Sequence, residues 1–176
     1  MKKTLSLVAA LVLAVIFSNQ ATAQEFKGLD KSPMDVAAYP SSYRVSDKVV
    51  KVTYSRPQLK GRSLGKLAPA GKVWRTGANE ATEITFYKDV NFGGTPVKAG
   101  TYTMYAIPGD KEWTIIISKQ LNVWGSYFYK DSQDVARVKG KVSKSKDNIE
   151  AFSIAFGDDK TMYLGWGDTI VSVPVK

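Results

Sequence analysis

The segment from Gly71 to Thr82 contains the side chains of this chain that are best suited to hold a ligand. Trp74, Arg75, Asn79 and Glu80 occur within seven residues of one another. An arginine guanidinium presents a planar set of donors that matches a carboxylate or a phosphate, and an indole ring offers a flat face to a sugar or a cation. Asparagine and glutamate supply polar atoms that orient a bound molecule. The segment therefore predicts a binding site for an anionic or sugar-bearing ligand.

The same segment also has a structural interpretation, which stays open at this point. Trp74 would then belong to the hydrophobic core, and Asn79 would hydrogen-bond its own turn. Arg75 would pair with Glu80 or Glu83. Such a pair would act as an internal brace and would leave no guanidinium for a ligand.

Two further guanidiniums belong to the candidate ligand-binding set. Arg56 precedes Pro57 at the end of a predicted strand, and Arg62 follows Gly61 in the next loop. Loops held by a rigid β-scaffold often carry binding residues, so we include Arg56 and Arg62 with the residues of the first segment.

A second candidate patch is aromatic. Trp124, Tyr127 and Tyr129 are followed closely by Asp131. Flat rings stack on sugars and carboxylates accept hydrogen bonds from hydroxyl groups, so this patch is predicted to line a carbohydrate groove. The alternative is that the rings are core residues, as most aromatic side chains in a β-sandwich are.

The acidic residues of the chain allow a third function, that of a glycan hydrolase. A glycan hydrolase needs two acidic groups roughly 5 to 10 Å apart across a cleft. Glu80, Glu83, Asp131 and Asp134 are the candidates. A calcium site is not expected, because no Asp-rich loop with a closing Glu occurs.

The composition excludes several kinds of chemistry. The chain has no His and no Cys. A Ser-His-Asp triad, a thiol nucleophile, a zinc site built on imidazole or thiolate, and a haem ligated by His or Cys are therefore excluded. We expect no cofactor, and the composition favours a binding or structural protein over an enzyme.

The first 23 residues have the pattern of a signal peptide. Lys2 and Lys3 precede the apolar run Leu5 to Phe17, and Ala21-Thr22-Ala23 is a small-x-small cleavage pattern. We expect cleavage after Ala23 and a periplasmic or secreted protein. Without Cys the cleavage site is not that of a lipoprotein, and no later apolar run approaches the ~20 residues of a membrane span. Neither a lipid anchor nor a transmembrane span is expected.

The net charge points to anionic partners. It is +9 for the whole chain, and loss of Lys2 and Lys3 with the leader leaves about +7. Outside the cytoplasm such a charge favours acidic glycans, lipid headgroups or lipopolysaccharide phosphates over nucleic acid, although it also serves solubility alone. Five cations between Arg137 and Lys146 are typical of an edge strand protected against aggregation.

Alternation of apolar and polar residues predicts a β-protein. It marks strands around Val50–Tyr54, Ile84–Phe86 and Phe152–Phe156. A hairpin is expected from Thr101–Ile107 and Trp113–Ser118, and two final strands from Thr161–Trp166 and Thr169–Val175. No stretch beyond the leader has a convincing helical period, although a turn or two of helix could lie in Leu121–Ala136. After the signal peptide, residues 24–43 are predicted to form an extended arm and residues 44–176 a single-domain β-sandwich of Ig-like or jelly-roll type.

Several motifs resemble the DUF2911 family over roughly Ser32 to Val175. They include Tyr54-Ser55-Arg56-Pro57, the run GKVWRTGANEAT from Gly71 to Thr82, and Trp124-Gly125 with Tyr127 and Tyr129. The resemblance implies an exported protein of Bacteroidota-type bacteria with a Gram-negative envelope. It carries no catalytic residue to this chain, because none is established for the family.

Three functions remain open, in decreasing order of preference. The first is a non-catalytic envelope domain that binds an anionic or sugar-bearing ligand such as an anionic glycan or lipopolysaccharide. The second is a structural component that docks onto another envelope protein. The third is the carboxylate-dependent glycan hydrolase.

Overall fold

The computed structural model describes residues 25–176, so the predicted signal peptide of residues 1–23 lies outside the described residues. The strands are β1 (Met34–Tyr39), β2 (Val50–Ser55), β3 (Thr82–Phe86), β4 (Val90–Phe92), β5 (Thr95–Val97), β6 (Gly100–Ile107), β7 (Glu112–Ser118), β8 (Asp134–Phe156) and β9 (Thr161–Pro174). Two short helical turns, α2 (Leu64–Leu67) and η1 (Asp131–Gln133), complete the set.

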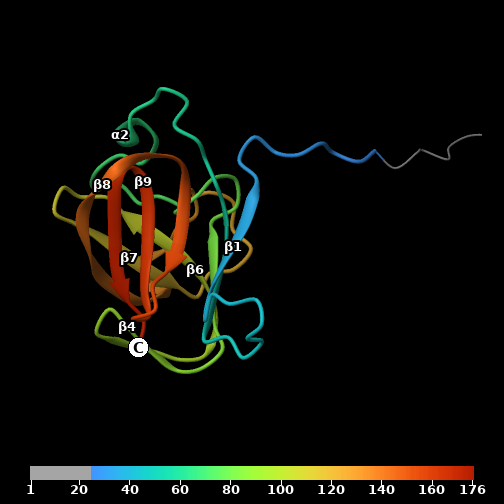
Figure 1. Ribbon diagram of the computed structural model, residues 1–176, viewed down its shortest axis with the longest axis vertical. Helices are drawn as coiled ribbons and strands as arrows, with labels where there is room; N and C mark the ends of the chain where they lie inside the picture. The colour runs from blue at the N-terminus through green and yellow to red at the C-terminus, as the bar shows by residue number, and fades with distance from the viewer. Residues whose placement is uncertain (1–24) are drawn as a thin grey trace, which may run out of the picture.

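Seven strands form one antiparallel sheet in the order β1-β2-β3-β6-β7-β8-β9 (Figure 1). The β4–β5 hairpin is inserted between β3 and β6, and all other neighbours in the sheet are consecutive in the chain, as in a β-meander. The prediction of an all-β, sandwich-like domain is confirmed. The predicted hairpin is also confirmed, because β6 pairs with β7 in the register Tyr105 to Ile116.

The long strands β8 and β9 bend together in the middle. Their register shifts between Lys144 and Ile149 and again before Ser153. Gly167 on β9, opposite Ile149, has a φ of 61°, which glycine adopts without steric cost. The two strands predicted from Thr161 to Val175 are therefore one bent strand, and the prediction of a break between them is wrong.

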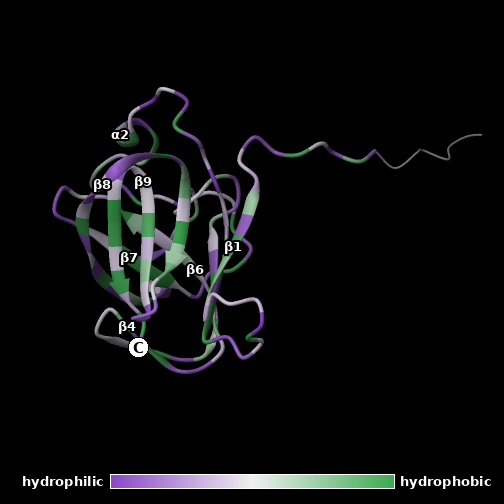
Figure 2. Ribbon diagram, in the orientation of Figure 1, coloured by the Kyte–Doolittle hydropathy of each residue, from purple (hydrophilic) through white to green (hydrophobic). Residues whose placement is uncertain are grey.

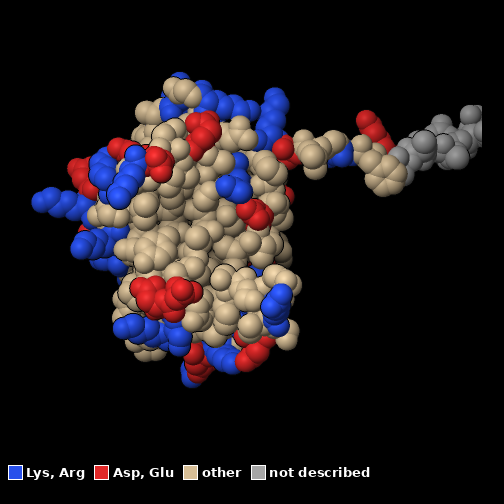
Figure 3. Space-filling view, viewed as in Figure 1, with Lys and Arg blue, Asp and Glu red and all other residues tan. Residues whose placement is uncertain are grey.

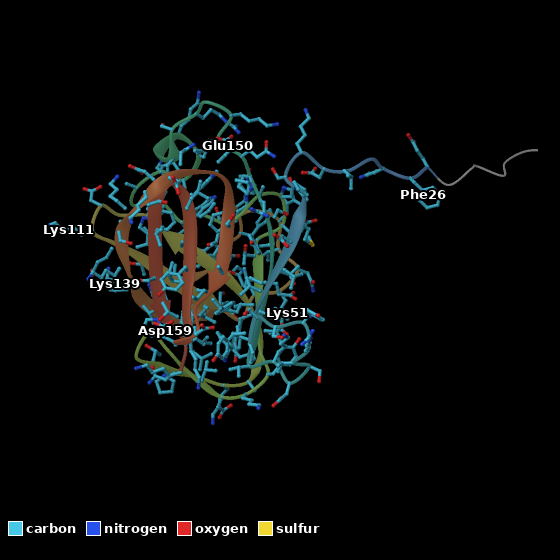
Figure 4. The ribbon with its side chains drawn as sticks, in the orientation of Figure 1. Phe26, Lys51, Lys111, Lys139, Glu150 and Asp159 are labelled. Carbon is cyan, nitrogen blue, oxygen red and sulfur yellow. The ribbon has the colours of Figure 1, made fainter. Side chains whose placement is uncertain are left out.

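The bend lets the second half of β8 reach the far side of the sheet. Phe152 N donates to Pro57 O at 2.9 Å and Leu59 N donates to Glu150 O at 3.0 Å. The Glu150 carboxylate, near α2 in Figure 4, accepts from Lys60 N at 2.7 Å. These contacts fasten the chain just beyond β2 to β8, so the sheet curls around one core. Figure 2 shows the resulting alternation of hydrophobic and hydrophilic residues along β8 and β9.

Aromatic rings fill the end of the core nearest this closure. Trp74 stacks on Trp166 with a centroid distance of 5.4 Å and an interplanar angle of 17°. Trp113 and Phe152 meet the Trp74 ring edge-on at 6.1 and 5.1 Å. All four rings are buried, and such edge-on and offset contacts add to the stabilisation from burial itself.

The cation-rich segment does not lie on an edge strand. Residues from Arg137 to Lys141 pair with β7, and Lys141 to Lys144 also pair with β9. The prediction of an edge strand is therefore wrong. Its cations alternate with buried residues such as Val138, so they cover the solvent face of a strand inside the sheet.

The N-terminal segment and the helices also differ in detail from expectation. Residues 25–33 have no regular structure, and Figure 4 shows Phe26 on an extension away from the sheet. Met34–Tyr39 form the edge strand β1, paired with β2. The turn α2 was not predicted, whereas η1 falls where a short helical turn was expected. Within residues 25–176, no helix has the length and apolar character needed to cross a membrane.

Candidate functional site

A hollow of 410 Å³ lies between α2, the segment before Thr76 and the loop after β7. We call it the Arg75 groove. Its walls include three cations, Lys66, Lys72 and Arg75, together with Ser126 and Tyr127. Its volume is in the range of small-molecule sites, whereas the hollow beside Gly109 measures 220 Å³ and that beside Glu80 measures 160 Å³.

Trp74 and Arg75 take opposite roles because they are neighbours on an extended backbone. Trp74 N donates to Ala106 O at 2.7 Å, and Ala106 N donates back to Trp74 O at 2.9 Å. This bridge to β6 turns the Trp74 side chain into the core. The next side chain in an extended segment points the other way, so Arg75 faces the groove.

The loop of residues 119–130 forms the opposite wall and is held by hydrogen bonds. Gly125 N donates to Asn79 O at 3.0 Å, and Ala81 N donates to Val123 O at 3.0 Å. The Ser126 hydroxyl donates to Val73 O at 3.0 Å. The two walls are therefore fixed to each other by the fold.

Gly125 allows the two walls to meet. Its φ is 66°, and a Cβ at this position would lie 2.6 Å from Tyr127 Cε2 and 3.2 Å from Arg75 Nη1. Glycine is the one amino acid that has no Cβ and that adopts this positive φ without steric cost. The Tyr127 ring and the Arg75 guanidinium consequently lie against the same glycine.

The cations of the groove have no acidic partners among residues 25–176. None of the ion pairs there includes Lys66, Lys72 or Arg75. Within the described part of the chain, the Arg75 guanidinium makes one hydrogen bond, a long one from Nε to Gly77 O at 3.4 Å. The pairing of Arg75 with Glu80 or Glu83 that the structural interpretation required is absent there. Figure 3 shows Lys and Arg at the end of the molecule that carries α2, and also along the side that carries β8 and at the opposite end.

Arg56 and Arg62 do not line this groove, and their guanidiniums make hydrogen bonds within the fold. Arg56 donates from Nη1 to Asp35 Oδ2 at 3.0 Å, from Nε to Phe152 O at 3.0 Å and from Nη2 to Ser153 Oγ at 2.7 Å. Arg62 donates to Leu59 O at 2.9 Å and to Gln58 O at 2.7 Å. Of the predicted set, only Trp74 and Arg75 line the groove; the prediction that the Trp74 ring faces a ligand is wrong, because that ring is buried against Trp166.

Asn79 and Glu80 support the neighbouring loop. Asn79 has a left-handed backbone with a φ of 59°, and its amide donates to Asp30 Oδ1 at 3.1 Å. Glu80 is exposed, and its backbone bridges that of Trp124. The Glu80 and Glu83 residues both line the separate 160 Å³ hollow.

The predicted aromatic patch is divided between solvent and interior. Trp124 and Tyr127 are 55% and 76% exposed. Tyr129 instead packs edge-on against buried Tyr105 at 5.0 Å. Asp131 is exposed at the start of η1.

Tyr129 is the centre of a polar network beneath the loop. Its hydroxyl donates to Asp134 Oδ2 at 2.5 Å, and Arg137 Nη1 donates to both of these oxygens at 2.7 Å. Burial, and next the adjacent Asp134, raise the pKa of Tyr129 to about 12. Because the Asp134 carboxylate accepts these hydrogen bonds, it does not form with Asp131 the solvent-open carboxylate pair that a glycan hydrolase needs. Within residues 25–176, no three acidic side chains gather as cation ligands would.

Sequence reasoning missed Lys66 and Lys72 as members of the groove. Lys72 lies inside the segment that was singled out, but without the fold nothing distinguishes it from other surface lysines. Lys66 is brought in by α2, a four-residue turn whose Ser63 makes no side-chain cap bond. Such a turn leaves almost no periodic signal.

We expect Arg75→Ala and Arg56→Ala to separate a ligand-facing arginine from a structural one. Among the described residues Arg75 makes a single long hydrogen bond, so its removal should change the free energy of unfolding by no more than about 0.5 kcal/mol. Arg56 joins β1, β2 and β8, and its removal leaves Phe152 O and Asp35 without this donor, at a cost of about 2 kcal/mol. Urea unfolding of both variants measures the difference. Equal losses would contradict this assignment of roles.

Alkaline pH should destabilise the fold through Tyr129. Its folded pKa of about 12 lies above the ordinary value of 10.0, so the stabilisation is complete below pH 10. It is lost as the pH rises from there through the folded pKa, because the unfolded phenol ionises first. Urea unfolding at about pH 9 and about pH 11 should show a larger loss for the wild type than for Tyr129→Phe. Identical losses would remove Tyr129 as the source.

Comparison with known proteins gives one match. A family model described as a protein of unknown function (DUF2911) matches residues 32–175. Neither a curated protein nor a solved structure matches the chain. The match covers β1 to β9, the Arg75 groove and the 119–130 loop, and the chain belongs to the DUF2911 family.

Proposed function

We propose that this protein is a non-catalytic binding domain whose Arg75 groove holds an anionic, sugar-bearing ligand. The observation that carries the proposal is a guanidinium without a carboxylate partner among the described residues, placed beside two lysines and an aromatic ring in a 410 Å³ hollow. A partly desolvated guanidinium with free donors gains more from a ligand carboxylate or phosphate than one that is already paired.

Each wall of the groove contributes a different interaction. Arg75 offers a two-pronged contact to a carboxylate or phosphate, and Lys66 and Lys72 add positive charge around it. The Tyr127 ring provides a flat apolar face for a sugar. No Asp or Glu residue of the described chain lines the groove, which favours binding over hydrolysis by a carboxylate pair.

The place of action that we propose is outside the cytoplasm. The support is the leader pattern of residues 1–23, which lie outside the described residues, and the charge of about +7 that remains without Lys2 and Lys3. Acidic glycans and lipopolysaccharide carry the carboxylate and phosphate groups that this groove would bind.

Export predicts a defined N-terminus. Protein expressed from the full chain and recovered from the periplasm or medium should begin at Gln24, because signal peptidase cuts after the small residue Ala23. N-terminal sequencing provides the measurement. Recovered protein that begins at Met1 would contradict cleavage and remove the main support for export.

The ligand class is tested with a carboxylated trisaccharide, trigalacturonate, and the neutral maltotriose. We expect calorimetric titration to show binding of trigalacturonate and at least roughly tenfold weaker binding of maltotriose, since one charge-assisted contact is worth about that factor. Arg75→Ala should weaken trigalacturonate binding by roughly tenfold or more. The affinity should fall with salt, because the contacts are ionic.

The matched control is Arg44→Ala. Arg44 is an exposed arginine that stacks on Tyr43 in the loop between β1 and β2, and it does not line the groove. This variant has the same change in net charge, so it should bind trigalacturonate as the wild type does. Equal weakening by both variants would mean that the net charge alone attracts the ligand. Absence of trigalacturonate binding by the wild type would overturn the carboxylated-sugar proposal.

A further inference from the structure

Four large apolar side chains lie exposed on the 119–130 loop. Leu121, Trp124, Tyr127 and Phe128 are 45%, 55%, 76% and 72% exposed, and we call them the apolar patch. Single exposed apolar residues are common on soluble proteins, but a group of four on one short loop marks a surface that contacts another phase or molecule.

The fold holds this patch outward. The Gln120 side-chain amide donates to Phe128 O at 2.9 Å, and its oxygen accepts from Lys130 N at 2.9 Å. Thr103 Oγ1 donates to Gln120 O at 2.5 Å. These hydrogen bonds hold the loop so that Tyr129 packs half-buried against Tyr105 while its neighbours Tyr127 and Phe128 lie in solvent.

Positive charge surrounds the patch. Lys66, Lys72 and Arg75 lie in the adjoining groove, which shares Tyr127 with the patch. Exposed Lys119 and Lys130 flank the loop at its two ends, and neither belongs to an ion pair among residues 25–176. The exposed acids of this region are Asp30, Glu80 and Asp131, so the five cations outnumber the acids around the patch.

Aromatic side chains ringed by lysine and arginine are the combination that the interface of an anionic bilayer attracts. Trp and Tyr favour the headgroup layer, where the ring is desolvated while its polar atom stays wet. Basic residues are drawn to the negative surface potential of anionic lipids. A second copy of this chain fits less well, because a symmetric contact would bring the two sets of cations together.

We propose that the apolar patch docks the protein on the surface of an anionic lipid bilayer. Trp124, Tyr127 and Phe128 enter the interfacial layer, and the phosphate of a lipid headgroup occupies the Arg75 groove. This inference rests on the proposed function, because it names a lipid as the source of the anionic group that the groove binds.

The test uses vesicles of phosphatidylglycerol and phosphatidylcholine, with pure phosphatidylcholine as the neutral comparison. Co-sedimentation should show at least roughly tenfold stronger binding to the anionic vesicles. Trp124 reports contact directly, because it is 55% exposed whereas Trp74, Trp113 and Trp166 are at most 6% exposed. Its emission should shift to the blue on anionic vesicles, and Trp124→Phe should abolish the shift.

A double variant separates the patch from the groove. Leu121 and Phe128 do not line the groove, so L121S/F128S should lose vesicle binding by roughly tenfold or more and keep its affinity for trigalacturonate. Arg75→Ala should weaken both kinds of binding. Tyr87→Ser is the matched control, because it also replaces an exposed apolar side chain by serine. Tyr87 is 48% exposed and follows the C-terminal end of β3, whereas Glu80, which lies near the patch, precedes the N-terminal end of that strand. A thermal melt of each variant verifies folding.

The outcomes distinguish this inference from the proposed function. Trigalacturonate binding without vesicle binding would overturn the docking proposal and leave the groove function in place. Vesicle binding without trigalacturonate binding would support docking and overturn the carboxylated sugar as a ligand. Vesicle binding that L121S/F128S retains would overturn the role of the patch. Light scattering that shows a dimer, converted to a monomer by L121S/F128S, would identify the patch as a self-contact and overturn docking.

Discussion

The stacking of Trp74 on Trp166 is the interaction on which the rest of the structure depends. Trp166 comes from β9, next to the bend at Gly167, and Trp74 from the segment that bridges to β6, so the stacked rings join the bend of the β8–β9 hairpin to β6. Phe152 and Trp113 meet the same Trp74 ring. This aromatic cluster adds to the burial of Ile154, Met162 and Leu164, which also hold the hairpin against the core.

The same anchor creates the groove. With Trp74 buried, alternation along the extended backbone turns Arg75 outward, and the bridge to Ala106 fixes its position. The loop opposite is placed by hydrogen bonds to Val73, Asn79 and Ala81, all within the same segment. Core packing and groove geometry are therefore linked through one short stretch of chain, in which Trp74 packs in the core and Arg75 faces the groove.

The arginines illustrate how the fold divides its charged groups. Arg56 and Arg62 donate to carbonyl groups and to Asp35, where the chain beyond β2 meets β8. A guanidinium suits such junctions because it satisfies several acceptors at once. Arg75 is chemically identical but has one long hydrogen bond, so its donors remain available. Residue type alone does not separate an arginine that holds the fold together from one whose guanidinium makes a single long hydrogen bond in the described chain.

The sequence by itself determined the all-β class, the β6–β7 hairpin and the family, because alternation and short motifs are local signals. It also identified Trp74 and Arg75 as a distinctive pair. Only the tertiary structure decided that β9 is a single bent strand, that the cation-rich part of β8 lies inside the sheet, and that Tyr127 faces solvent while the half-buried Tyr129 packs against Tyr105. The 119–130 loop is irregular, so spacing in sequence does not fix which way its side chains point. Those directions follow from hydrogen bonds to residues about fifty positions away, and the groove exists only once these bonds have formed.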